Sequence, residues 1–247
     1  MKREYWERMA HSYEDEIFDV RKNDQKKHIT KAILKLASAE KSVIDIGCAV
    51  GKWLPLLSPV YKEVVALDIS QKNLDIAKDL YPGLKNVKYV RADMSGKAKL
   101  KRCDVGICIN AILTPRQKDR DIFFKGLNGC LKKGGHLILT IPALESWLLT
   151  NILQHKYKID PAHFKAERNS KEAIRKWNNI RQGNADIDDV PHKHYLQEEL
   201  SLLLHMEGFT ELRFEKIEYD WSTEFHKVPK WLKEPKPWDW MVVGRKK

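Results

Sequence analysis

The feature that most constrains the fold is a regular alternation of apolar and amphipathic segments between residues 24 and 142. The apolar segments are short and rich in β-branched residues, as buried strands are, and the segments between them have helical periodicity. This alternation predicts right-handed β-α-β units and a mostly parallel sheet with helices on both faces. The five predicted strands are SVIDIG (42–47), EVVALDIS (63–70), NVKYVRAD (86–93), CDVGICIN (103–110) and HLILTIP (136–142).

The helices between these strands have identifiable ends. Asp24 and Ser70 are placed to cap two of them, and Pro82-Gly83 is placed to end the second. A short helix is predicted over about 51–58, and a longer one over about 116–131 ends in a basic turn before Gly134-Gly135.

The pattern changes after residue 142. Residues 143–195 are polar, basic and too long for an ordinary connection, so we predict an insertion that covers a ligand site. A helix over 196–208 and two strands over 211–221 and 238–245 follow, with an antiparallel pairing and a bulge between Phe214 and Ile217. The predicted organisation is a single domain over 1–247, divided into an N-terminal lid helix (1–23), a core (24–142), the insertion (143–195) and a C-terminal helix and strand pair (196–247).

Composition excludes several classes of protein. The chain has 247 residues, a formal net charge of +11 and 43% hydrophobic residues, so it can bury a core and is not expected to be disordered. No apolar run approaches the roughly 18–20 residues of a membrane span. The first ten residues, MKREYWERMA, lack the apolar region of a secretion signal. Because the four cysteines form no C-x-x-C pair, we expect buried thiols in a reduced, cytoplasmic protein.

The most informative motif is DIGCAVG (45–51), which lies where the first strand meets the following helix. Gly47 allows a tight turn at the strand end, and Gly51 opens the helix without a side chain in the way. The spacing differs from the dinucleotide-binding fingerprint G-x-G-x-x-G, because Ala49 and Lys52 occupy the positions of its second and third glycines. The motif therefore favours a ligand other than a pyrophosphate.

Three acids follow three successive strands. Asp45 lies at the entrance to the glycine turn, Asp68 ends the second strand, and Asp93 ends the third. Because the carboxyl ends of parallel strands share one edge of the sheet, these carboxylates are expected to surround one ligand. A ligand with an amine or sulfonium, a ribose and an adenine fits three acids in this order.

These motifs resemble those of the class I S-adenosylmethionine-dependent methyltransferases of the small-molecule type. VIDIGCAVG, VVALDIS, VKYVRADMS, DVGICINAIL and KKGGHLILTIP appear in the order of that family and cover about the central two-fifths of the chain. The resemblance implies a doubly wound, Rossmann-like, mostly parallel seven-stranded α/β sheet whose last strand is antiparallel, with N-terminal helices and a helical insertion after the fifth strand. It also implies that S-adenosylmethionine is bound and S-adenosylhomocysteine released. Ala49 is a departure, since many members have glycine there.

The resemblance assigns roles to individual positions. It implies that Asp45, Gly47, Cys48 and Gly51 contact the methionine part of the cofactor, and that Asp68 holds the ribose. The remaining assignments are Ile69 against the adenine, Asp93 and Met94 at its edge, Asn110 near the transferred methyl group, and Tyr5, Trp6 and Tyr13 as contacts from the lid.

Methyl transfer from a sulfonium is an in-line displacement, in which the protein mainly aligns the two reactants and excludes water. A general base is needed only where the acceptor keeps its proton. No metal is expected, because a His-x-His pair at 192 and 194 has no accompanying third ligand. The candidates for a base or anchor are His163, His192, His194 and Tyr195, and those for contact with the acceptor are Tyr157, His163, Trp177 and His194.

The nature of the acceptor stays open between alternatives. A small molecule under the 143–195 insertion is the first, and the surplus of Lys and Arg would suit an anionic one. RNA, such as tRNA or rRNA, is the second, because residues 85–102 contain seven basic residues and one acid. Against RNA, the fourth-strand motif is Asn-Ala-Ile-Leu and not the Asn/Asp-Pro-Pro-aromatic sequence of base-amine methyltransferases. A noncatalytic cofactor-binding scaffold is the third alternative.

Overall fold

The structure, a computed structural model, describes residues 3–10, 19–96, 100–160, 170–187 and 190–247. Within this part of the chain, the central element is a seven-stranded sheet with the order β3-β2-β1-β4-β5-β9-β8. Strands β1 to β5 are parallel, and β9 is antiparallel to both of its neighbours, β5 and β8, which confirms the predicted fold class. The strands are β1 (Ser38–Ile46), β2 (Tyr61–Asp68), β3 (Val87–Arg91), β4 (Cys103–Ile109), β5 (Leu131–Pro142), β8 (Phe209–Glu218) and β9 (Trp238–Lys246).

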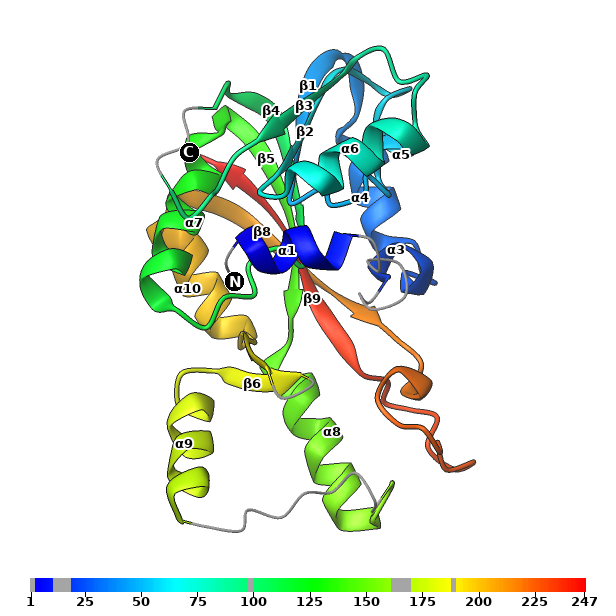
Figure 1. The fold of residues 1–247 in the computed structure, drawn as a ribbon, viewed down its shortest axis with the longest axis vertical. Helices are drawn as coiled ribbons and strands as arrows, with labels where there is room; N and C mark the ends of the chain where they lie inside the picture. The colour runs from blue at the N-terminus through cyan, green and yellow to red at the C-terminus, as the bar shows by residue number, and fades with distance from the viewer. Residues whose placement is uncertain (1–2, 11–18, 97–99, 161–169, 188–189) are drawn as a thin grey trace.

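Helices cover both faces of this sheet (Figure 1). On one face, α4 (His28–Leu36), α5 (Leu54–Leu57) and α6 (Gln71–Leu80) bury Ile33, Leu57 and Leu74 against the strands. On the other face, α7 (Gln117–Gly129) and α10 (Gln197–Met206) bury Phe124 and Leu204. The two apolar layers explain why the carboxyl-terminal halves of β1, β2 and β5 are almost continuously apolar.

The predicted capping residues act as expected. Both carboxylate oxygens of Asp24 accept hydrogen bonds from backbone amides at the start of α4, and the Ser70 hydroxyl accepts one from the amide of Asn73 in α6. Each bond satisfies an amide that the helix itself leaves unpaired. The predicted helix over 51–58 is shorter in the structure, because only Leu54–Leu57 is helical.

The predicted bulge in the C-terminal hairpin is wrong in its position. The pairing of β8 with β9 is continuous from Arg213 to Glu218, and its register shifts between Thr210 and Arg213. The apolar phase changes after Phe214 for another reason. Phe214 packs with the core on the α7 side of the sheet, whereas Ile217, an odd number of residues further on, packs on the α4 side.

Two further segments lie at the carboxyl edge of the parallel strands. The first contains α1 (Arg3–Met9), which crosses in front of the sheet, and α3 (Val20–Asn23) (Figure 1). The second, below the sheet in this view, contains α8 (Leu144–Tyr157), α9 (Ser170–Ile180) and a hairpin of β6 (Asn184–Ile187) and β7 (Val190–Lys193). The second segment falls within the predicted insertion. In the described residues, no helix is long and apolar enough to cross a membrane.

Candidate functional site

The turn after β1 lies at the point where the strand order reverses. Strand β1 lies between β2 on one side and β4 on the other. Ligands of doubly wound sheets bind at such a position. The amides of Gly47 and Cys48 both donate to the carbonyl of Leu67 in β2, at 2.8 and 2.9 Å. Gly47 has a φ of +74°, and a Cβ there would lie 2.5 Å from the Cβ of Ala111. The turn thus requires glycine, because the loops after β1 and β4 are in contact.

Asp45 and Asp68 form a pair of buried carboxyl groups at the ends of the neighbouring strands β1 and β2. Asp45 is 2% exposed, and its Oδ2 has no hydrogen-bond partner among the described residues. Burial, together with the negative charge of Asp68, raises the pKa of Asp45 to about 7. Burial also raises the pKa of Asp68. An ionised carboxylate in such surroundings favours a cationic or hydrogen-bonding ligand group.

Asp68 is held in a fixed orientation by the loop and helix beside it. Its Oδ2 accepts from the amide of Ala49 at 3.0 Å, and its Oδ1 accepts from the amide of Ser70 at 2.8 Å and from Asn73 Nδ2 at 3.4 Å. Ala49 reaches this position with a φ of +47°, in the left-handed region that usually favours glycine. The strain at Ala49 therefore accompanies the positioning of Asp68.

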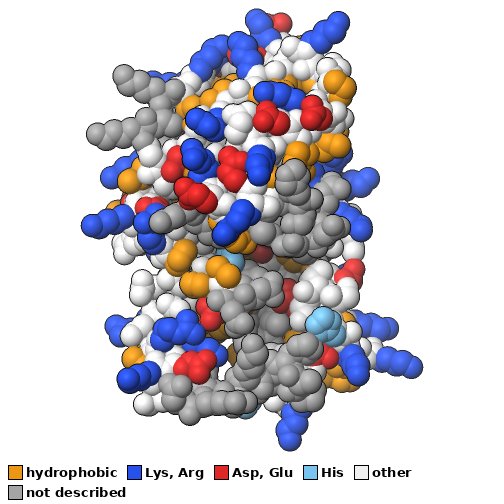
Figure 2. All heavy atoms as spheres, in the orientation of Figure 1, with side chains coloured by type: hydrophobic (Ala, Val, Ile, Leu, Met, Phe, Trp, Pro, Cys, Tyr) orange, Lys and Arg blue, Asp and Glu red, His pale blue; other side chains and the backbone are white. Residues whose placement is uncertain are grey.

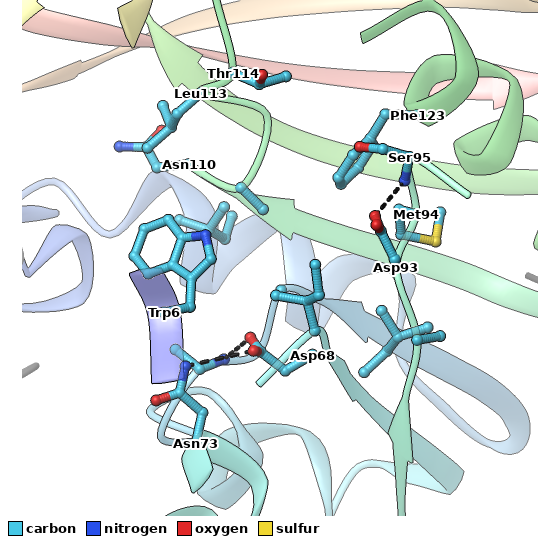
Figure 3. Close-up of a pocket in the computed structure, with 17 residues that line it drawn as sticks. Trp6, Asp68, Asn73, Asp93, Met94, Ser95, Asn110, Leu113, Thr114 and Phe123 are labelled. Carbon is cyan, nitrogen blue, oxygen red and sulfur yellow. Dashed lines mark hydrogen bonds between the residues drawn. The ribbon is translucent and has the colours of Figure 1, made fainter. Parts of the chain in front are cut away.

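A first cavity extends from Asp68 to the end of β3 (Figure 3). Asp93 and Met94 line it on the β3 side, and Asp93 Oδ1 accepts from the amide of Ser95 at 2.8 Å. Trp6 from α1 lies between Asp68 and Asn110 in this view. The structure thus brings together most of the predicted cofactor-binding residues. The residues that line this first cavity are Trp6, Gly47, Ala49, Leu67, Asp68, Ile69, Asn73, Ala92, Asp93, Met94, Ser95, Ile109, Asn110, Ala111, Leu113, Thr114 and Phe123.

A second and larger cavity, of about 610 Å³, adjoins the first. Six residues, Asn110 among them, line both cavities, so the two meet at the ends of β1 and β4. Asp45 and Cys48 line the second cavity beside the glycine turn, and Ser146 and Trp147 from α8 line it from the insertion. The acids in its lining are Asp19, Asp45, Glu224 and Asp239, and the Lys and Arg residues are Arg21 and Lys52.

A polar cluster that the sequence did not reveal lies where the cavities meet. Asn110 has a φ of +48°, and its Nδ2 donates to Asp239 Oδ2 at 2.7 Å. The Tyr219 hydroxyl donates to the same oxygen at 2.6 Å. Because β9 is antiparallel, its first residues lie at the carboxyl edge of the parallel strands, which brings Asp239 to the site. The acid between two tryptophans in WDW (238–240) is the sequence signal that could have indicated it.

The predicted histidines of the insertion reach the second cavity. His192 and His194 both line it, and both are largely buried. Burial lowers the pKa of His194 to about 4, so its ring is neutral at pH 7. Its Nδ1 lies 3.1 Å from the carbonyl of His192, which places the proton on Nδ1 and leaves Nε2 as an acceptor. Among the described residues, no three potential metal ligands gather at one point.

Four predicted site residues are not brought to either cavity. Gly51 has a φ of +79°, and its absent side chain leaves room for Leu54, so its place in the structure is a packing position. Tyr195 is fully buried against Phe124 in the core. Tyr157 stacks edge-on with Trp231, and Trp177 is 61% exposed on α9. Tyr13 and His163 lie outside the described residues.

Helix α1 is attached to the site by a carboxylate that the sequence did not single out. Glu7 accepts from the amides of Gln71 and Lys72, at 2.9 and 3.3 Å, at the N-terminus of α6. Desolvation acts to raise the pKa of Glu7, but these backbone hydrogen bonds act in the opposite direction, and the pKa of Glu7 is lowered. A carboxylate at this position satisfies unpaired amides and the positive end of the helix dipole. Tyr5 and Trp6 of the same helix line the second cavity.

Comparison with protein families identifies the central part of the chain. Residues 44–139, which include both motif glycines and the strand-end acids, match the family described as a methyltransferase domain. Comparison with curated proteins found no match.

Solved structures of the same fold cover nearly the whole chain. NodS, an N-methyltransferase from Bradyrhizobium japonicum in complex with S-adenosylhomocysteine, has a TM-score of 0.61 at 12% identity over 99% of this chain and 97% of that one. DhpI in complex with S-adenosylhomocysteine has a TM-score of 0.60 at 14% identity over 98% and 94%. A possible histamine N-methyltransferase from Thermotoga maritima has a TM-score of 0.58 at 20% identity over 99% of both chains. Residues 44–139 therefore match a methyltransferase domain, and the chain as a whole has the fold of solved S-adenosylmethionine-dependent methyltransferases.

Proposed function

We propose that this methyltransferase transfers the methyl group of S-adenosylmethionine to a small molecule held in the second cavity. The observation that carries the proposal is the joining of two cavities at Asn110. The smaller lies over the carboxyl ends of β2 and β3, and the larger lies under α8 and the segment around His194. A cofactor with an adenosine half and a methionine half can place its methyl group at this junction.

The residues of the first cavity fit the adenosine half. Asp68 has a carboxylate oriented by three hydrogen bonds and accessible to the cavity, as binding of ribose hydroxyls requires. Ile69 and Met94 supply apolar contacts for a ring, and Asp93 supplies an acceptor for an exocyclic amine. We assign the ribose to Asp68 and the adenine to the other three residues.

The methionine half is assigned to the turn after β1. Asp45 has a buried oxygen with no partner among the described residues, and a ligand ammonium group would supply one. The turn at Gly47 and Cys48 brings backbone close to the same place. Gly51 keeps the turn packed against α5 and α6 and is not assigned a contact.

The chemistry follows from the arrangement of the two cavities. When bound, the cofactor supplies a sulfonium-activated methyl group, so the chain itself needs to orient the acceptor and exclude water. Trp6 and Trp147 cover the cavities from α1 and α8. His194 is neutral at pH 7 and retains an acceptor nitrogen, so it is the candidate base for an acceptor that carries a proton.

The surface gives less support to RNA as the acceptor. Figure 2 shows Lys and Arg side chains interspersed with Asp and Glu on the face over α1 and α6. Within the basic stretch 85–102, Lys88 and Lys101 both form ion pairs with Glu63. A surface that binds phosphates along a nucleic acid needs cations that are not neutralised by such pairs.

A labelled-methyl assay tests the proposal. The protein is incubated with methyl-labelled S-adenosylmethionine and with small-molecule or RNA fractions from the source organism. We expect label in the small-molecule fraction, and its loss with the Asp68→Ala variant. Label in RNA alone would replace this proposal with the RNA alternative, and no transfer to either fraction would favour a noncatalytic scaffold.

A further inference from the structure

The second cavity contains a carboxylate that is buried, oriented and without a cationic partner. Asp239 is 8% exposed, and its two side-chain hydrogen bonds, from Asn110 and Tyr219, both fall on Oδ2. In the described part of the chain, Asp239 forms no salt bridge, and no hydrogen bond to its Oδ1 occurs. Burial raises the pKa of Asp239, because its effect is larger than that of the two hydrogen bonds, which lower the pKa. A carboxylate held in this way has one oxygen left to bind a ligand.

A second carboxylate lines the same cavity. Glu224 follows the short helix η3 (Trp221–Thr223). The residue is exposed to solvent and lines the second cavity, with protein atoms close around its carboxylate. The surrounding protein and the nearby Asp239 raise its pKa. Among the described residues, no Lys or Arg pairs with Glu224. Two carboxylates that repel one another in one cavity favour a cation between them.

Other groups in this cavity point to a ligand independently of the acids. His194 is 5% exposed, lines the cavity, and has an Nε2 with no partner among the described residues. The indole nitrogen of Trp238, which is also in the lining, is buried without a partner there. Trp147 and Tyr219 add aromatic walls, which attract cations as well as apolar groups. The acceptor nitrogen of His194, the aromatic faces and the carboxylates are together the features of a site for an organic amine, and the indole N–H of Trp238 can donate to an acceptor elsewhere on the same ligand.

The basic side chains of the cavity lining do not offset these acids. Lys52 forms an ion pair with Asp19 at 2.7 Å, and Arg21 donates to the carbonyl of Lys52. Both are therefore engaged near α3 and the turn after β1. The lining around Asp239 and Glu224 is therefore negatively charged, whereas the chain as a whole has a net positive charge. The net positive charge favours an anionic acceptor, and the charge of the cavity favours a cationic one.

We infer that the methyl acceptor is an amine whose nitrogen binds between Asp239 and Glu224, an inference that rests on the proposed function and names its substrate class. Asn110 bonds directly to Asp239 and lies at the junction of the cavities, so a nitrogen held there is next to the position assigned to the methyl group. Before transfer, the ammonium form gives a proton to a carboxylate or to His194 Nε2. The nitrogen lone pair then forms the N–C bond, the C–S bond breaks, and its electron pair remains on sulfur as a neutral thioether.

Ligand-observed NMR titrations with matched fragments test this inference. The probes are phenethylamine, 2-phenylethanol and phenylacetate, and a second set of tryptamine, tryptophol and indoleacetate, each with and without S-adenosylhomocysteine. We expect each amine to bind at least about tenfold more tightly than its alcohol and carboxylate analogues, since hydrogen bonds to charged groups are the stronger ones. Equal or tighter binding of the alcohols or carboxylates would overturn the inference.

Variants locate the effect. Glu224→Gln keeps the shape of an accessible side chain and should lower amine affinity about tenfold, and Asp239→Asn should do the same. Glu215→Gln, on an exposed carboxylate of β8, is the matched control and should leave amine affinity unchanged. An amine preference that survives in Glu224→Gln would overturn the assignment. Calorimetry with S-adenosylhomocysteine on the same proteins separates the proposed function from the amine site. If the wild type gives no binding isotherm with S-adenosylhomocysteine but still prefers amines, only the proposed function is refuted.

Discussion

Replacing Asp45 by Asn should stabilise the ligand-free protein and abolish its response to cofactor. The Asp45 carboxyl is buried beside Asp68, and its pKa is about 7 in the folded protein. Its usual value is 3.8, so the folded state keeps a proton that the unfolded chain loses between these two pH values. At about 1.36 kcal/mol per pKa unit, the ionised carboxylate opposes folding by about 4 kcal/mol above pH 7.

The sign of the pH dependence follows directly. A raised pKa in the folded state means that the contribution of Asp45 to stability falls as pH rises from about 4 to about 7 and is constant above. Asn does not titrate. The advantage of Asp45→Asn over the wild type should therefore grow by about 2 to 3 kcal/mol between pH 5 and pH 8, whatever fixed cost the buried amide adds.

Urea unfolding of both proteins at pH 5 and pH 8, without ligand, measures this difference. For a chain of this size, about 2 kcal/mol corresponds to roughly 4–8 °C in melting temperature, so thermal unfolding is an independent check. S-adenosylhomocysteine should raise the melting temperature of the wild type and leave that of Asp45→Asn unchanged. A stability difference that is the same at both pH values would refute the reasoning.

Three other substitutions test the positions of single groups. Gly47→Ala should destabilise the protein by about 1–3 kcal/mol in urea unfolding, because its Cβ would meet Ala111, whereas Gly83→Ala, with open space around its Cβ, should change little. Ala49→Gly should relieve a left-handed conformation and raise stability by up to about 1 kcal/mol, and a loss of stability would contradict the strain inferred there. Glu7→Gln should increase hydrogen exchange in α1 without changing exchange in β1, since it removes the charge that binds the start of α6; equal exchange in both proteins would argue against this attachment.

Much of the fold follows from local sequence patterns. The inner parallel strands β1, β2, β4 and β5 each contain a run that is buried on both faces, so their apolar runs are easily recognised. Asp24 and Ser70 mark helix starts by the residue type that caps require. The acids at strand ends were recognisable for a similar reason. The topology brings the ends of β1, β2 and β3 to one edge, so Asp68 and Asp93 line the first cavity and Asp45 lines the second cavity beside it.

The acceptor side of the site depends on contacts between distant residues. Asn110 and Asp239 are 129 positions apart, and only the antiparallel insertion of β9 beside β5 brings them together. The phase change between Phe214 and Ile217 resembled a bulge because sequence periodicity cannot show that a strand packs on different faces along its length. Tyr195 shows that nearness in sequence to a site does not place a side chain in it. It follows His192 and His194, which line the cavity, but its own side chain is buried in the core.

Calorimetric titration with S-adenosylhomocysteine tests the central claim most directly, because the claim is that the first cavity holds the adenosine half of this ligand. Asp68 is the residue on which the assignment depends, and its carboxylate is the group that should bind the ribose. The account predicts a saturable one-to-one isotherm for the wild type and at least tenfold weaker binding for Asp68→Ala, with Asp75→Ala on the exposed face of α6 as the control that binds normally. A wild-type protein that gives no saturable binding, or an Asp68→Ala variant that binds as well as the wild type, would contradict it.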